Sequence, residues 1–173
     1  MSEWKMLTLV GQDKPGIVAK ITTALFEAGA QLGEASMMRL GGNFTIMLMV
    51  KTEQSIVQLN DDIESVAKAM QLSCYFQDIE ASLHQHAIPD TCVTVYGADR
   101  AGIVSKVTSH LLDAGFNIMD LDSDVAGDEA EPIYVMHIEG VTANGTDALE
   151  QAMEAIKMQG VHIDVTAIDV MIV

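Results

Sequence analysis

The chain has 173 residues, of which 49% are hydrophobic, and it carries a formal net charge of −16. This charge argues against binding to DNA or RNA, because phosphate binding is driven by lysine and arginine side chains that release counterions. The longest apolar-rich run, residues 44–50, is far shorter than the roughly 18 residues of a membrane-spanning helix. The first residues contain no apolar leader and the two cysteines lie far apart, so we expect a cytoplasmic protein without a membrane partner.

The first half of the chain alternates strand-like and helix-like segments. In chain order these are a strand at 5–10, a helix from about 13 to 29, strands at 32–40 and 44–50, a helix at 56–70 and a strand at 72–83. Pro15 presets a helical φ near the start of the first helix, and Gly29 is suited to end it. Gly41 and Gly42 can take positive φ, which indicates a hairpin between the two middle strands.

The second half repeats this order. Its predicted elements are a strand at 91–96, a helix at 103–114, strands at 117–125 and 133–139, a helix at 147–158 and a strand at 161–173. The octet Gly11-Gln12-Asp13-Lys14-Pro15-Gly16-Ile17-Val18 returns 86 residues later as Gly97-Ala98-Asp99-Arg100-Ala101-Gly102-Ile103-Val104. We therefore predict two domains, 1–84 and 91–173, joined by a linker at 85–90.

The middle hairpin differs between the copies. Aligning Met47 with Met136 raises the offset to 89, which predicts a second hairpin three residues longer than the first. The second half is also more acidic, with three basic and fifteen acidic residues in 85–173 against six and ten in 1–84. This imbalance favours a basic protein surface over nucleic acid as a partner.

The repeated order predicts an α+β fold of two ferredoxin-like βαββαβ domains. Each would have an antiparallel four-stranded sheet with both helices on one face. The other face would be open, and its alternating apolar residues, together with the twelve methionines of the chain, predict that units or chains cover one another. We therefore expect a homo-oligomer.

A strand followed by Asp-x-x-Gly-Ile-Val, an amphipathic helix and Ala-Gly resembles the ACT domain, a regulatory module that binds amino acids. The matching residues are Asp13, Gly16, Ile17, Val18, Ala28 and Gly29, then Asp99, Gly102, Ile103, Val104, Ala114, Gly115, Asn117 and Ile118. Two such domains with no attached enzyme resemble the glycine cleavage system transcriptional repressors. Members of that family are thought to act by binding an activator protein rather than DNA.

The resemblance implies that a small amino acid, such as glycine, binds between the first strand-to-helix turn of one domain and a neighbouring domain. The implied ligand-binding residues are Asp13, Lys14, Pro15, Gly16, Ile17 and Gln31 in the first copy, and Asp99, Arg100, Ala101, Gly102, Ile103 and Asn117 in the second. Independently of the family, a glycine lets the backbone approach a ligand, and N–H groups at a helix start favour a carboxylate by about 0.3–1 kcal/mol. The copies differ at Gln31 and Ala101, so whether one or both bind stays open.

Several of these residues also have a purely structural interpretation. Gly16 and Gly102 could serve only the tight turn, and Asp13 and Asp99 are expected to cap the following helices. A further acidic group comprises Asp120, Asp122, Asp124, Asp128, Glu129 and Glu131. We interpret it as a solvated face rather than a metal site, because Val125 stands where a calcium loop requires glycine. His84 and His86 lack a third ligand nearby, so they are predicted to be linker residues.

No catalytic motif stands out, which favours a non-enzymatic regulator without a cofactor or metal. The alternative is a small phosphate-handling enzyme of the acylphosphatase type, in which Arg100 would hold the phosphate. The acidic composition and the lysine at the equivalent position, Lys14, argue against it. RNA-recognition modules share the element order, but only 5% of the residues are aromatic and the base-stacking motif is absent.

Overall fold

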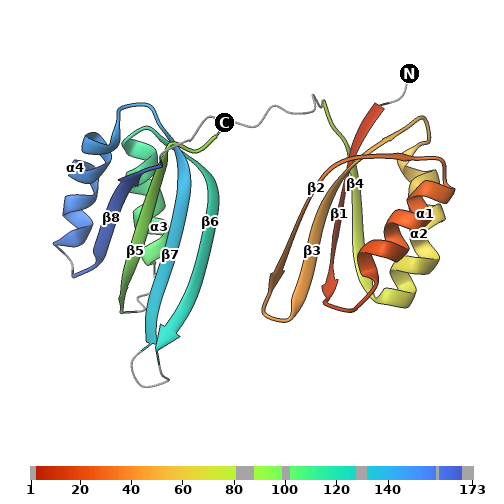
Figure 1. Ribbon diagram of the computed structural model, residues 1–173, viewed down its shortest axis with the longest axis horizontal. Helices are drawn as coiled ribbons and strands as arrows, with labels where there is room; N and C mark the ends of the chain where they lie inside the picture. Colours follow the sequence, from red (N-terminus) through yellow and green to blue (C-terminus); the bar gives the residue numbers. More distant parts are fainter. Residues whose placement is uncertain (1–2, 81–87, 99–101, 128–131, 159, 169–173) are drawn as a thin grey trace. The chain divides into compact units, whose positions relative to one another are not determined.

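The computed structural model describes residues 3–80, 88–98, 102–127, 132–158 and 160–168. By its internal contacts the chain divides into two compact units, unit 1 (Met1–Gln85) and unit 2 (His86–Val173). Within the described residues, each unit contains a four-stranded antiparallel sheet with two helices (Figure 1). The predicted α+β, ferredoxin-like fold is confirmed.

The elements follow the order read from the sequence. Unit 1 contains β1 (Glu3–Gln12), α1 (Ile17–Glu27), β2 (Gln31–Leu40), β3 (Asn43–Thr52), α2 (Ile56–Met70) and β4 (Leu72–Asp78). Unit 2 contains β5 (Thr91–Ala98), α3 (Ile103–Asp113), β6 (Phe116–Gly127), β7 (Pro132–Thr142), α4 (Thr146–Lys157) and β8 (His162–Ala167). β4 and β8 end before the predicted strands do; residues 81–83 and 169–173 of those predictions lie outside the described residues.

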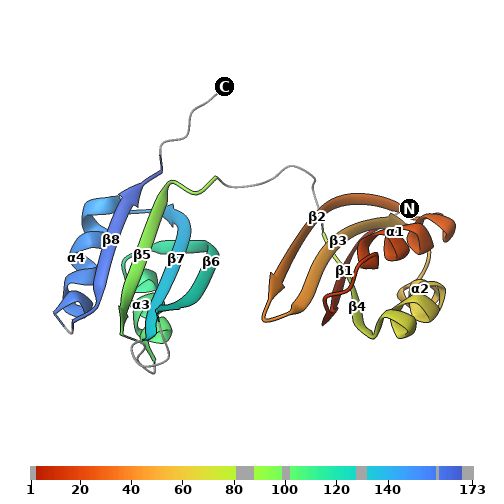
Figure 2. The same ribbon diagram turned by 60° about the horizontal axis from the view of Figure 1, so that its bottom comes forward.

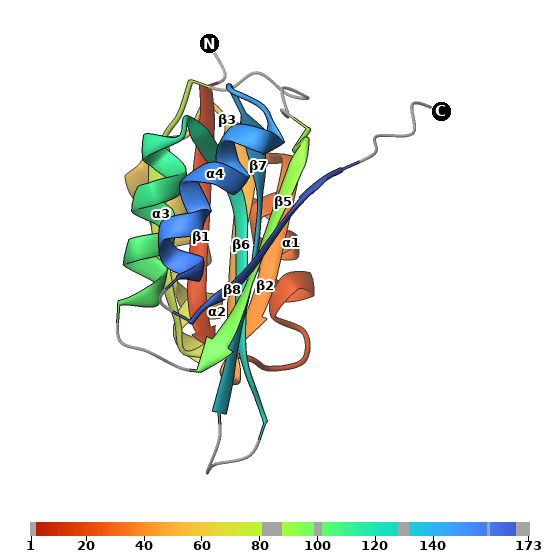
Figure 3. The ribbon, with the colours of Figure 1, turned by 90° about the vertical axis from the view of Figure 1, so that its left-hand side faces the viewer.

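The strands are ordered β2-β3-β1-β4 in unit 1 and β6-β7-β5-β8 in unit 2. In unit 1 both helices lie on one side of the sheet (Figure 2), and in unit 2 α3 and α4 lie together along one face (Figure 3). Alternating strand residues such as Leu7 and Leu9 meet the helix residues Ile21 and Leu25, and all four are fully buried. The core of each unit therefore lies between one sheet face and its two helices, and the other sheet face carries no helix of that unit.

The start of α1 differs from the prediction. The helix begins at Ile17, four residues after Asp13, and its N-cap is Gly16 in a left-handed conformation with φ of 87°. No side chain caps this end, so the expected capping by Asp13 is wrong. The backbone N–H of Asp13 donates instead to the carbonyl of Gly42 at 3.1 Å, which holds residues 13–16 in a turn against the β2–β3 hairpin. The capping residue expected for the second copy, Asp99, lies outside the described residues.

The predicted alignment of the hairpins is also wrong. The strand registers match Met47 with His137 and Ile46 with Met136, an offset of 90 rather than 89. Ile46 and Met136 are both buried in their cores, whereas Met47 lies on the opposite sheet face. Because side chains alternate along a strand, a one-residue slip exchanges the two faces. The second hairpin is therefore four residues longer than the first.

An amide contact is duplicated as well. The side-chain amide of Gln54 donates to the carbonyl of Ala28 at 3.0 Å, and that of Asn144 donates to Ala114 at 2.9 Å. In both units this bond ties the end of the first helix to the loop before the second. The two units therefore share specific polar contacts as well as their element order.

Candidate functional site

The β1–α1 turn of unit 1 borders a hollow of about 500 Å³ that is open to solvent. Three elements form its walls: the turn with the start of α1, the end of β2, and the start of β3. The lining residues are Asp13, Lys14, Pro15, Gly16, Ile17, Val18, Ala19, Met37, Arg39 and Phe44. Its size suits a small metabolite.

The helix start supplies free backbone donors to this hollow. The first bond of α1 runs from the N–H of Lys20 to the carbonyl of Gly16 at 3.0 Å. The N–H groups of residues 17–19 come before it, so they have no acceptor within the helix. Since no side chain caps this end, these groups and the helix dipole favour an anion beside Gly16.

Charged side chains of both signs complete the hollow. The guanidinium of Arg39 pairs with the carboxylate of Asp13 at 2.5 Å, and the Arg39 side chain is 68% exposed whereas that of Asp13 is 27% exposed. Lys14 points to another partner, because its ammonium donates to the side-chain oxygen of Gln71 at 2.5 Å. The hollow thus presents a carboxylate and a guanidinium side by side, an arrangement suited to a zwitterionic ligand.

Most of the residues predicted for the first copy lie together in this hollow, namely Asp13, Lys14, Pro15, Gly16 and Ile17. Gln31 does not, because it is the first residue of β2 and pairs with Lys51, whereas Arg39 lies near the other end of that strand. Eight residues of strand separate Gln31 from Arg39 by about 26 Å. Gln31 therefore lies outside this hollow.

Sequence reasoning missed Met37, Arg39 and Phe44, which line the hollow from β2 and β3. Alternation along the predicted strand 32–40 is a signal that could have placed Met37 and Arg39 on the helix side of the sheet. It does not reveal that the hairpin folds beside the β1–α1 turn. That placement follows from the pairing of β1 with β3, which brings Gln12 opposite Asn43, and from the hydrogen bond between Asp13 and Gly42.

In unit 2 the corresponding turn is only partly described. Gly102 has a φ of 85° and is the N-cap of α3, again without a side-chain cap, and Ile103 is buried. Asp99, Arg100 and Ala101 lie outside the described residues. Arg100 is the arginine on which the acylphosphatase alternative depends. Asn117 is exposed near the start of β6, just as Gln31 lies at the start of β2 in unit 1.

The strand registers reveal one difference between the two turns. The residue of β6 that corresponds to Arg39 is Val125, since Arg39 pairs with Phe44 and Val125 pairs with the matching Tyr134. Val125 is exposed and cannot bind an anion. The cation that β2 contributes in unit 1 therefore has no equivalent on β6.

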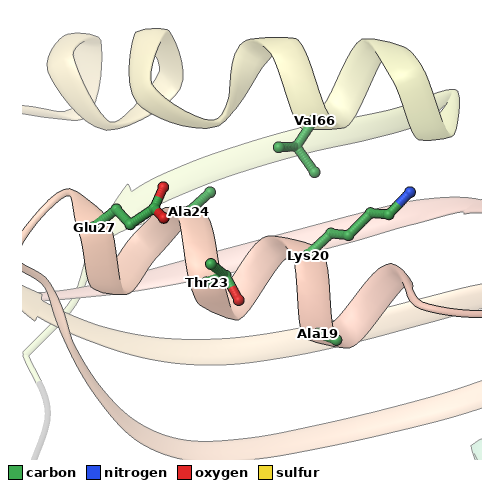
Figure 4. A pocket seen from close by; sticks show the side chains of 6 residues that line it. All are labelled: Ala19, Lys20, Thr23, Ala24, Glu27 and Val66. Carbon is green, nitrogen blue, oxygen red and sulfur yellow. The ribbon is translucent and has the colours of Figure 1, made fainter.

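A second hollow, of about 320 Å³, lies between α1 and α2 (Figure 4). Figure 4 shows Val66 of α2 pointing toward α1, with Lys20 and Glu27 near opposite ends. Its walls are otherwise the small residues Ala19, Thr23 and Ala24. Because no polar groups converge on it, this hollow is a weaker candidate than the one at the β1–α1 turn.

The open sheet face of unit 2 carries the acidic residues singled out in the sequence. Asp120, Asp122 and Asp124 are exposed on one side of β6, opposite Glu139, His137 and Val135 of β7. Within the described part of the chain, no group of three or more His, Cys, Asp or Glu side chains is placed to hold a metal. The remaining members of the predicted acidic group, Asp128, Glu129 and Glu131, and the linker histidines His84 and His86 lie outside the described residues.

On the same face the Tyr96 hydroxyl donates to the Asp164 carboxylate at 2.5 Å. This hydrogen bond and the negative charge of Asp164 raise the pKa of Tyr96 above its ordinary value of 10.0. The folded state thus holds the proton more tightly, so the resulting stabilisation is complete below pH 10 and is lost as the pH rises through the raised pKa.

The titration of Tyr96 can be followed as the difference in tyrosinate absorbance between the wild type and Tyr96→Phe. We expect this difference to titrate with a midpoint above pH 10, and we expect Asp164→Asn to lower the midpoint. An unchanged midpoint in Asp164→Asn would contradict this assignment.

The family model of the ACT domain matches residues 6–84, which lie within unit 1. The chain is 44% identical over 50 residues to the UPF0237 protein YjhC of Lactococcus lactis subsp. lactis, a match that covers 29% of this chain. The chain spans 58% of the length of that relative.

Among the described residues, no helix combines the length and the hydropathy that a membrane span requires.

Two solved structures resemble the whole chain. One is a protein of unknown function from Galdieria sulphuraria, with a TM-score of 0.75 and 21% identity, covering 98% of this chain and 100% of that one. The other is a protein proposed to be a glycine cleavage system transcriptional repressor, with a TM-score of 0.69 and 17% identity, covering 97% and 98% of the two chains. At these identities the likeness shows a shared fold over nearly the whole chain, in agreement with the predicted fold class.

Proposed function

We propose that this chain, whose first unit matches the ACT-domain family model, is a non-enzymatic regulator that binds a small amino acid and controls transcription of glycine cleavage genes through a protein partner. One observation carries the ligand-binding half: the uncapped start of α1 borders the same hollow as the Asp13–Arg39 pair. The fold shared with a protein proposed to be such a repressor supports the regulatory half.

The charges of the hollow suggest how the ligand binds. Its carboxylate would accept hydrogen bonds from the backbone N–H groups at the start of α1 and from the guanidinium of Arg39. Its ammonium would lie against the carboxylate of Asp13. Gly16 carries no side chain at the mouth of this site, and a Cβ built there has no neighbour within 4 Å, so the backbone is accessible to the ligand.

Unit 1 is proposed as the principal site, because Val125 replaces the cation that Arg39 provides. Gln31 and Asn117 lie at the far ends of their strands, so either would complete a site only from another unit. The site residues of unit 2, including Gly102 and Ile103, would then hold a ligand weakly.

A protein partner is proposed in preference to DNA on electrostatic grounds. The chain carries a net charge of −16, and the open face of unit 2 presents Asp120, Asp122 and Asp124. Nucleic acid would be repelled by this field, whereas a basic surface of an activator protein would be attracted. Occupancy of the hollow would alter the affinity for that activator.

Calorimetry of the full chain tests ligand binding. We expect glycine to bind, and acetate and methylamine, which each carry half of its charges, to bind at least about tenfold more weakly. Replacing Arg39 by valine, the residue found in unit 2, should weaken glycine binding at least about tenfold, because a charge-assisted hydrogen bond contributes roughly 1.5–3 kcal/mol. Lys68→Val, which removes an exposed cation of α2, is the control and should leave binding unchanged.

Two results would contradict the proposal. One is the absence of binding by any amino acid at millimolar concentration. The other is an Arg39→Val variant that binds glycine as the wild type does.

A further inference from the structure

The ligand hollow of unit 1 is larger and more apolar than glycine needs. Its volume, about 500 Å³, lies in the range of pockets that hold complete small-molecule ligands, about 300–1,000 Å³, so bound glycine would leave much of it to water. Besides the charged pair, the lining includes Val18 and Ala19 of α1 and Met37 of β2. These three side chains carry no charge and no strong hydrogen-bonding group. They form an apolar wall of the hollow.

Met37 lies on the same side of β2 as Arg39. Met37 pairs with Ile46 of β3, and Arg39 pairs with Phe44. Both partners are buried in the core between the sheet and the helices. Two residues of strand separate Met37 from Arg39 by about 6.6 Å. A ligand whose carboxylate binds Arg39 can therefore reach Met37 with a side chain of a few carbons.

The apolar wall leaves hydrophobic surface in contact with water. The exposed fraction is 54% for Met37 and 40% for Val18. Covering such surface with an apolar group is favourable, because it releases the surface from water. A methionine side chain is flexible, so it can adapt to the shape of the group that covers it. The wall is therefore suited to pack against an aliphatic side chain of the ligand.

Unit 2 has serines at the matching positions of its described residues. Ser123 of β6 corresponds to Met37, since Ser123 pairs with Met136 as Met37 pairs with Ile46. Ser105 of α3 stands where the repeat places an alanine in α1. Both serines are exposed. The cation and the apolar wall therefore occur together in unit 1, as expected if they bind two parts of the same ligand.

We propose that the hollow prefers amino acids with an aliphatic side chain, such as leucine, over glycine, and that Met37 is the residue that determines this preference. The inference rests on the proposed function, because it assigns the side chain of the same ligand. The ammonium and carboxylate bind as they do in glycine. The aliphatic side chain packs against Met37 and Val18 and displaces water. A polar side chain of the same shape would lose hydrogen bonds to water there.

Calorimetry of the full chain with glycine, leucine and asparagine tests the preference. We expect leucine to bind at least about tenfold more tightly than glycine, because each fully buried methylene strengthens binding about fourfold. Asparagine has nearly the shape of leucine but a polar end. It should therefore bind at least about tenfold more weakly than leucine does.

Variants of β2 test the role of Met37. Met37→Ser introduces the residue found in unit 2, and it should bring leucine binding within about threefold of glycine binding while leaving glycine binding unchanged. Met37→Gln, which keeps the length of the side chain and makes its end polar, is a second variant with the same expected result. Met38→Ser is the matched control, because Met38 is 49% exposed and lies on the opposite face of the same strand. It should change neither affinity.

Circular dichroism shows which variants are folded, and only those are compared. If glycine binds and leucine binds no more tightly, the preference is refuted while the proposed function stands. A leucine preference that persists in the folded Met37 variants would overturn the assignment of Met37. If no amino acid binds, the proposed function itself is contradicted, and this inference is lost with it.

Discussion

Gly16→Val is expected to abolish glycine binding while Gly102→Val leaves it intact. Gly16 has a φ of 87°, a left-handed conformation that disfavours a side chain by roughly 1–2 kcal/mol. Its new side chain would stand beside the hollow where the ligand carboxylate is proposed to meet the start of α1. We expect the dissociation constant for glycine to rise at least about thirtyfold, as a lost set of charge-assisted hydrogen bonds implies. Calorimetry well below the unfolding temperature measures this change.

Gly102→Val is a closely matched control. Gly102 has a φ of 85°, occupies the same N-cap position, and likewise has no neighbour within 4 Å of an added Cβ. Both variants should lose similar stability, so a difference in binding reports on the site rather than on folding. Loss of binding in Gly102→Val alone would place the site in unit 2 and would refute the assignment to unit 1.

Gly140→Val is expected to produce the largest loss of stability. A Cβ at Gly140 would overlap the backbone carbonyl oxygen of Asn117 and would lie 2.7 Å from Cζ of Phe116, both on the neighbouring strand β6. A backbone atom cannot move aside as the end of a flexible side chain can. We therefore expect the free energy of unfolding of unit 2 to fall by about 3 kcal/mol or more. Differential scanning calorimetry should then show the unit 2 transition lowered by roughly 12 °C or more, with the unit 1 transition unchanged.

A comparison with unit 1 gives the reason for glycine at position 140 of unit 2. The residues that correspond to Gly140 and Phe116 are Val50 and Ala30, both buried, so the two units exchange a large residue for a small one across the same strand pair. Adding Phe116→Ala to Gly140→Val should therefore recover part of the lost stability. Gly97→Ala is the control and should cost less than about 1 kcal/mol, because an added Cβ there has neighbours no nearer than 3.8 Å. A Gly140→Val variant as stable as this control would contradict the argument.

Much of the ligand hollow could be predicted from the sequence. The repeated octet places Asp13, Lys14, Pro15 and Gly16 at a strand-to-helix junction, and these residues do line one hollow. The role of Asp13 could not be predicted. Helix capping is a local interaction, whereas its observed partner Arg39 is 26 residues away on another strand. A sequence motif reports local conformation, and it does not report which distant side chain fills the space beside it.

The sequence by itself determined the duplication, the βαββαβ order of each unit and the backbone freedom at Gly16 and Gly102, because periodicity and glycine placement are local properties. The tertiary structure decided which residues face each other. Strand register aligned Met47 with His137, separated an apolar sheet face from an acidic one, and placed Val125 where unit 1 has Arg39. Register depends on pairing between segments far apart in the chain, and a shift of one residue turns every side chain of a strand to the other face.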